Sequence, residues 1–141
     1  DIVSNARAFA GALAAEGFDV LAESRGYTAS HQVLTRHGEL DSGAGAKAAQ
    51  RLEEAGIITN MNMLPGDTKA MTPSGLRLGV QELTRVGFSN DDMEEVASFY
   101  ARVLLHGEDP AAVRADVHAL KQQRQTIRYC FNEDERSGYP E

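Results

Sequence analysis

An arginine flanked by glycines is the residue of this sequence best suited to bind a ligand. It is Arg77, in the stretch Ser-Gly-Leu-Arg-Leu-Gly at 74–79. The alternation predicts a strand on which the two leucines face one way, while Arg77, Gly75 and Gly79 face the other. Glycine has no side chain, so a ligand can approach the backbone, and the planar guanidinium suits a carboxylate or a phosphate. The alternative, more common on spacing alone, is an exposed arginine in a surface ion pair.

Two asparagines, Asn60 and Asn62, precede a Pro-Gly-Asp turn at 65–67. If the backbone is extended there, residues i and i+2 point the same way, and the two amides could hydrogen-bond the edge of a heterocycle. The more common alternative is a loop stabilised by asparagine turns. The segment 57–72 lacks helical periodicity, which predicts a loop flanked by short extended pieces, and long ordered loops are often functional.

The other reactive residue types do not form a catalytic set. His31 begins a weak strand, where a histidine is more often structural than catalytic. Lys47, Lys69 and Lys121 lie in polar surroundings, so nothing activates an amine. Cys130 is the one cysteine, which excludes an internal disulfide, and no Cys/His spacing indicates a zinc site, so no metal is expected. The sequence therefore offers groups that can hold a ligand, without a nucleophile and its base.

Composition narrows the class of protein. The chain has 141 residues, 42% of them hydrophobic and 25% charged, which is enough to bury the core of one domain. A net charge of −7 argues against nucleic acid as the main partner. No apolar run approaches the ~20 residues of a membrane helix, and no signal-peptide pattern is visible, so we expect no membrane partner and a cytoplasmic location.

Periodicity and capping residues predict a two-layer α/β sandwich, in which helices cover a small mixed or antiparallel sheet. Helices are predicted at 1–16, at 41–55, at 80–85, from Ser89 and from Asp109. Strands are predicted at 18–21, at 31–36, at 74–79 and at 126–131. The segment 132–141 is read as a polar tail. The first helix is already under way at residue 1, so we expect the natural chain to extend upstream.

Together these segments resemble the serine hydroxymethyltransferases, over roughly residues 1–125. The stretch 74–79, with Leu-Thr at 83–84 and Gly-Phe at 87–88, resembles the signature near the end of that family. The upstream pieces follow in the same order: Ser-Asn-Ala-Arg at 4–7, Gly-Phe-Asp-Val at 17–20, a histidine at 31, Asn-Met-Asn at 60–62 and Pro-Gly-Asp at 65–67.

The resemblance implies a domain organisation and a cofactor. These enzymes are fold-type I pyridoxal-phosphate proteins with a large and a small domain, and this chain resembles the C-terminal small domain, at 1–131. The lysine that anchors the cofactor belongs to the missing large domain, so the chain alone should be inactive. The intact enzyme is implied to act on the Cα–Cβ bond of serine, glycine or another β-hydroxy amino acid, as a homodimer or tetramer.

The resemblance also assigns roles to residues. Arg77 is assigned to the α-carboxylate of the amino-acid substrate, with His31 as a further substrate contact. Asn62, and Asn60 beside it, are assigned to the pterin ring of tetrahydrofolate. No catalytic residue is assigned within this chain.

Departures from the family pattern, such as the following two, leave alternatives open. Met61 stands inside the family's Asn-Lys-Asn, and residues 79–81 are Gly-Val-Gln where the family has Gly-Thr-Pro. Since Arg77 is kept while groups on the acceptor side change, a threonine aldolase or transaldolase with an aldehyde acceptor is an alternative. A third hypothesis is a free-standing, non-catalytic domain that binds a carboxylate or another chain.

Overall fold

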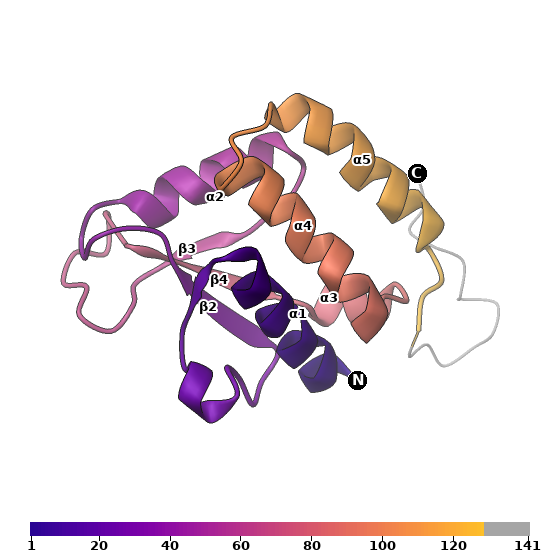
Figure 1. Ribbon diagram of the computed structural model, residues 1–141, viewed down its shortest axis with the longest axis horizontal. Coiled ribbons are helices and arrows are strands. Elements are labelled where there is room, and N and C mark those ends of the chain that lie inside the picture. The colour runs from indigo at the N-terminus through magenta and orange to yellow at the C-terminus, as the bar shows by residue number, and fades with distance from the viewer. Residues whose placement is uncertain (129–141) are drawn as a thin grey trace.

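Helices pack on one face of a four-stranded antiparallel sheet in the computed structural model, which describes residues 1–128 (Figure 1). The spatial order of the strands is β1-β2-β4-β3. Their bounds are Asp19–Val20 for β1, Gln32–Arg36 for β2, Asn60–Asn62 for β3 and Gly75–Gly79 for β4. The predicted two-layer α/β class is confirmed, and every strand pair is antiparallel rather than mixed.

Side chains alternate across β4 as the sequence predicts. Leu76 and Leu78 are 0% and 2% exposed and face the helices, whereas Arg77 is exposed on the opposite face. We call this opposite face the outer face of the sheet. The register sets Arg77 directly between Leu34 of β2 and Asn60 of β3. The outer face therefore presents Arg77 and Asn60, two of the residues that the sequence analysis proposed for ligand binding.

The helices supply the other half of the core. They are α1 (Ile2–Glu16), α2 (Ala44–Glu54), α3 (Gln81–Arg85), α4 (Met93–Leu104) and α5 (Pro110–Gln123), with the 3₁₀ turns η1 (Glu23–Arg25) and η2 (Asn90–Asp92). Apolar stripes on α1, α2, α4 and α5 join the inner face of the sheet in one buried cluster, in which α5 packs on α2 and α4. Within it, the rings of Phe9 and Tyr100 meet edge to face at 5.3 Å between centroids.

Local capping explains where the helices begin and end. Gly17 ends α1 in a left-handed conformation, φ 106°, and its amide bonds the carbonyls of the last turn. Ser89 and Asp92 form the expected capping box. That box caps the 3₁₀ turn η2 rather than the α-helix, so α4 begins four residues later than predicted. Asp109 caps α5 by accepting from the Ala111 amide at 3.0 Å.

The structure adds one strand to the predicted set and removes part of another. The edge strand next to β4 is β3, at 60–62, within the segment expected to be a loop with extended pieces. The strand predicted at 126–131 is wrong over 126–128, where the backbone forms none, and residues 129–131 lie outside the described part. The amide of Arg128 instead donates to the Arg85 carbonyl at 2.7 Å, which holds this segment against the end of α3.

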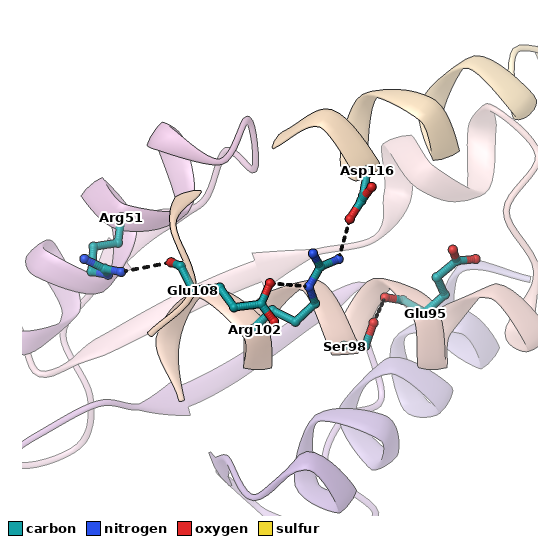
Figure 2. Close-up of polar contacts among 6 residues, drawn as sticks. All are labelled: Arg51, Glu95, Ser98, Arg102, Glu108 and Asp116. Atoms are coloured by element: carbon teal, nitrogen blue, oxygen red, sulfur yellow. Dashed lines mark hydrogen bonds and ion pairs between the residues drawn. The ribbon is translucent and has the colours of Figure 1, made fainter. Parts of the chain in front are cut away.

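A charged cluster ties three helices together. Arg102 of α4 lies 2.9 Å from Glu108, through Nε and Oε2, and 2.8 Å from Asp116 of α5, through Nη1 and Oδ2 (Figure 2). Hydrogen bonds with Asp116 and Glu108 raise the pKa of Arg102. Arg51 of α2 reaches the Glu108 carbonyl at 3.5 Å (Figure 2). No helix within residues 1–128 is long and apolar enough to cross a membrane.

Candidate functional site

Arg77 is exposed near the centre of the outer face, with its hydrogen-bonding capacity unused. Within residues 1–128 its side chain makes no hydrogen bond or ion pair, although ion pairs do occur elsewhere on the surface. Its strand partners on the same face are Leu34, which is apolar, and Asn60, which is neutral. The alternative interpretation, in which Arg77 forms a surface ion pair, is therefore not supported within residues 1–128. An unpaired guanidinium on an open sheet is suited to a carboxylate ligand.

The two glycines flanking Arg77 do not leave open space, as the sequence argument supposed. A Cβ at Gly75 would lie 2.4 Å from the side chain of Leu64, which is 3% exposed and packs over that glycine. A Cβ at Gly79 would lie 2.4 Å from Oε1 of Gln81. The glycines thus admit two side chains of this chain itself. Along β4, Arg77 therefore lies between the side chains of Leu64 and Gln81.

The two asparagines share the face of Arg77, as expected for an extended segment. Asn60 pairs with Arg77 across the strands, and Asn62 pairs with Gly75. The Nδ2 of Asn62 donates to the Met63 carbonyl at 2.7 Å, whereas the Asn60 side chain makes no hydrogen bond within residues 1–128. Asn60 therefore keeps both ends of its amide available to a ligand, and Asn62 keeps its Oδ1.

The loop after β3 is held in place by Asp67. Its carboxylate accepts from the backbone amides of Asp41, Leu64 and Ser74, and from the Ser74 hydroxyl, at 2.7–3.0 Å. Desolvation raises the pKa of Asp67, but these four hydrogen bonds outweigh it and leave the pKa well below its usual range. Asp67 thereby keeps Leu64 over the sheet and fixes the end of the strand that carries Asn60.

Asp41 makes the reciprocal contact to the same loop. Its Oδ1 accepts from the amides of Thr68 and Lys69, and its Oδ2 from the Thr68 hydroxyl, each at 2.7 Å. The hydrogen bond from the Thr68 hydroxyl is the main cause that lowers the pKa of Asp41. Asp41 and Asp67 are structural acceptors, so the loop predicted to contact substrate is ordered before any ligand arrives.

The two histidines of this region differ in environment. His31 is exposed, one residue before β2, and its carbonyl accepts from the Val80 amide at 3.4 Å. Strand alternation assigns the outer face to residues 32, 34 and 36, so His31 has the opposite parity to Arg77. His37 is half-buried against Phe18, with Nε2 2.8 Å from Thr35 Oγ1, and burial lowers its pKa to about 4 despite nearby Asp19.

The described residues fit a carboxylate but not pyridoxal phosphate. Lys47 and Lys121 are exposed on helices, and Lys69 is exposed in a loop, so none of these lysines is buried for covalent attachment. No group of three or more His, Cys, Asp or Glu within 1–128 is arranged to hold a metal ion. The chemistry supported by this arrangement is binding and orientation.

The family model for serine hydroxymethyltransferase matches residues 1–100. This chain belongs to the serine hydroxymethyltransferase family. It is 53% identical over 133 residues to the serine hydroxymethyltransferase of Thermococcus kodakarensis, covering 93% of this chain and 31% of that protein. The Pyrobaculum neutrophilum enzyme is 52% identical, covering 94% and 30%. The chain thus spans about a third of the length of these curated relatives.

A solved structure of another enzyme has the same fold as this chain. The L-threonine transaldolase of Pseudomonas fluorescens, in an internal aldimine state, superposes with a TM-score of 0.77 and 34% identity, covering 87% of this chain and 27% of that one. That neighbour is a fold-type I pyridoxal-phosphate enzyme. The family and the fold class implied by the sequence are both confirmed.

Two residues that depart from the family pattern, Val80 and Met61, lie away from the outer face of the sheet. Val80 is 0% exposed in the core. Met61 pairs with Leu76, whose side chain faces the helices, so alternation turns Met61 away from Asn60. The side chain of Gln81 does reach the outer face. The sequence did not predict this position, because periodicity does not indicate that the first residue of a helix folds back over the preceding strand.

Proposed function

We propose that this chain is the small, substrate-binding domain of a pyridoxal-phosphate enzyme acting on the Cα–Cβ bond of serine, glycine or another β-hydroxy amino acid. The observation that supports the proposal is the exposed, unpaired Arg77 side chain on the outer face of the sheet, in a chain of the serine hydroxymethyltransferase family. The rest of the enzyme, including the anchor of the cofactor, would lie outside residues 1–128.

In this proposal, Arg77 binds the substrate α-carboxylate through its planar fork of donors. Fixing the carboxylate fixes the rotation of the substrate about its Cα, so the bond to be broken is held in one orientation. The strand supports this role because Leu76 and Leu78, on either side of Arg77, are buried and hold its backbone rigidly. The cofactor would supply the electron sink, and this chain would supply the orientation.

The acceptor side of the reaction would involve Asn60 and Asn62. Their amides face outward beside Arg77 and can bond the donor and acceptor edge of a pterin ring. Tetrahydrofolate is therefore the first candidate acceptor. The second candidate is an aldehyde, as in a threonine transaldolase, and the structural likeness to such an enzyme favours it.

The remaining assignments stay predictions. His31 is proposed as a substrate contact from the resemblance, and its parity would require the chain to turn just before β2. The proposed partners are the large domain and a second copy of the enzyme, in a homodimer or tetramer.

Glycine binding to the full-length enzyme tests the proposal. We expect Arg77→Ala to weaken binding by roughly 2–5 kcal/mol, the usual cost of removing one partner of a desolvated charge pair. Arg77→Lys should weaken glycine binding nearly as much, because the point charge of an ammonium group does not replace the bidentate guanidinium. Arg114→Ala, at an exposed position on α5, is the matched control and should bind normally. Unchanged glycine affinity in both Arg77 variants would remove the carboxylate role.

A further inference from the structure

The side chain of Gln81 lies on the outer face although the residue begins helix α3. A Cβ built on Gly79 would be 2.4 Å from Gln81 Oε1 and 3.2 Å from its Nε2, so the amide covers that glycine. Gly79 shares its face with Arg77, two residues away on the same strand. The backbone turn between β4 and α3 thus places the side-chain amide of Gln81 over the outer face, although Gln81 itself belongs to the helix.

The distances place this amide within reach of a ligand of Arg77. Two residues of a strand span about 7 Å, and a ligand held at the end of the guanidinium can lie between them. Because the amide of Gln81 ends in both a donor and an acceptor, rotation about its last bond can present Nε2 to an anion. Neither Arg77 nor Gln81 makes a side-chain hydrogen bond within residues 1–128.

The surrounding charges favour an anionic ligand at this position. Arg36, also on the outer face, is already paired with Asp19 at 3.3 Å. Glu82, the acidic residue next to Gln81, is paired with Arg85 at 3.1 Å. Gln32, opposite Gly79 across the strands, is neutral. A carboxylate bound by Arg77 would therefore meet a neutral donor beside it.

We propose that Gln81 Nε2 donates a hydrogen bond to the same carboxylate that Arg77 binds. The carboxylate site of this chain is then a pair, with a charged fork on β4 and a neutral amide folded back from α3. This inference rests on the proposed function, because it takes Arg77 as the primary carboxylate ligand. The competing role for Gln81 is to fill the space over Gly79 without touching a ligand.

The test measures glycine affinity by calorimetry on the full-length enzyme. Gln81→Met keeps the length of the side chain and removes its donor, and we expect about tenfold weaker binding, as for a hydrogen bond to a charged group. Gln81→Glu places a carboxylate against a carboxylate, and we expect a larger loss that shrinks at high salt. Gln50→Glu, exposed on α2, makes the same charge change and should leave the affinity unchanged.

A second variant keeps the test informative if substitutions at Gln81 disturb α3. In Gly79→Ala the new Cβ meets only the flexible end of Gln81, so the variant should fold and displace the amide. We expect it to weaken glycine binding in the wild-type background and to add nothing in the Gln81→Met background. An equal loss in both backgrounds would show that the methyl group acts by its own bulk, which overturns the role of Gln81.

The outcomes separate this inference from the proposed function. Wild-type glycine affinity in Gln81→Met, together with a large loss in Arg77→Ala, would refute the donor role of Gln81 and keep the carboxylate site. Wild-type affinity in the Arg77 variants as well would refute both. Loss in both sets of variants, with Gln50→Glu unchanged, supports the pair.

Discussion

The side-chain amide of Asn5, on α1, donates to Thr84 Oγ1 on α3 at 2.9 Å and to the Phe88 carbonyl at 3.0 Å. Both side chains are buried, and Thr84 in turn donates to the Val80 carbonyl at 2.8 Å. Asn5 and Thr84 belong to two segments that carry the family resemblance. Part of that resemblance therefore reflects a buried polar bridge that joins the first helix to the end of β4.

The 141-residue chain should fold without the rest of the enzyme. One core joins four helices to the sheet, and a core of that extent supports an independent domain. The isolated chain should nevertheless bind no stoichiometric pyridoxal phosphate, because its described lysines are exposed. Cooperative urea unfolding checks the first expectation. Borohydride trapping followed by mass spectrometry checks the second, and one cofactor on a single lysine of each chain would contradict it.

Asn5→Ala should destabilise this chain by about 1–3 kcal/mol, because it leaves buried acceptors at Thr84 and Phe88 without their donor. Ser4→Ala is the matched control. The Ser4 hydroxyl bonds Asn90 at the exposed surface, so its loss should cost less than about 0.5 kcal/mol. Urea midpoints of the two variants give the comparison, and equal midpoints would show that the buried bridge contributes nothing.

The stability of the chain should depend on His37 at mildly acidic pH. The pKa of His37 is about 4 in the folded chain, compared with 6.5 for an unperturbed histidine, the value taken for the unfolded chain. Between about pH 4 and pH 6.5, therefore, the unfolded state binds a proton that the folded state does not. Stability is therefore lost as pH falls from about 6.5 to about 4, by at most about 3 kcal/mol, with no further contribution from His37 below that range.

Urea unfolding at several pH values measures this dependence. His37→Gln, which keeps a polar partner for Thr35, should flatten the profile between about pH 4 and 6.5. His106→Gln removes an exposed histidine and should leave the profile as it is in the wild type. A His37→Gln profile as steep as that of the wild type would assign the pH dependence to other groups.

Local patterns predicted the parts of the fold that depend on neighbours in sequence. The alternation in β4, the glycine after α1 and the proline at the start of α5 each act within a few residues, and each is found as expected. The orientation of Arg77 follows from the same alternation. Strand ends were less accurate, because a strand such as β3 exists only by pairing with β4.

Contacts across long loops were not predictable from spacing. Asp41 and Asp67 are 26 residues apart and bind each other's loop through backbone amides, which leave no pattern in the sequence. The contact of Leu64 with Gly75 likewise depends on that loop closing. A glycine in a strand indicates close approach, but only the structure identifies the group that approaches.

The acceptor in the proposed reaction is the point on which the family resemblance and the structural neighbour differ. Asn60 and Asn62 face outward beside Arg77, so a pterin edge can still be bound. Met61, the departure that suggested a changed acceptor, has the opposite parity, and Val80 is buried in the core. These substitutions therefore give no direct reason for tetrahydrofolate to be excluded.

Titration of tetrahydrofolate into the glycine-bound, full-length enzyme decides between the acceptors. If the pterin ring is bound here, Asn60→Ala should weaken tetrahydrofolate binding by about fivefold, corresponding to one hydrogen bond of about 1 kcal/mol. Met61→Lys, which restores the family's Asn-Lys-Asn, should change it by less than about twofold, because its side chain points away from that face. Absence of tetrahydrofolate binding in the wild type, with exchange of threonine for a product of an added aldehyde, would establish the transaldolase alternative. A large gain in Met61→Lys would instead show that position 61 reaches the acceptor, against the strand parity described above.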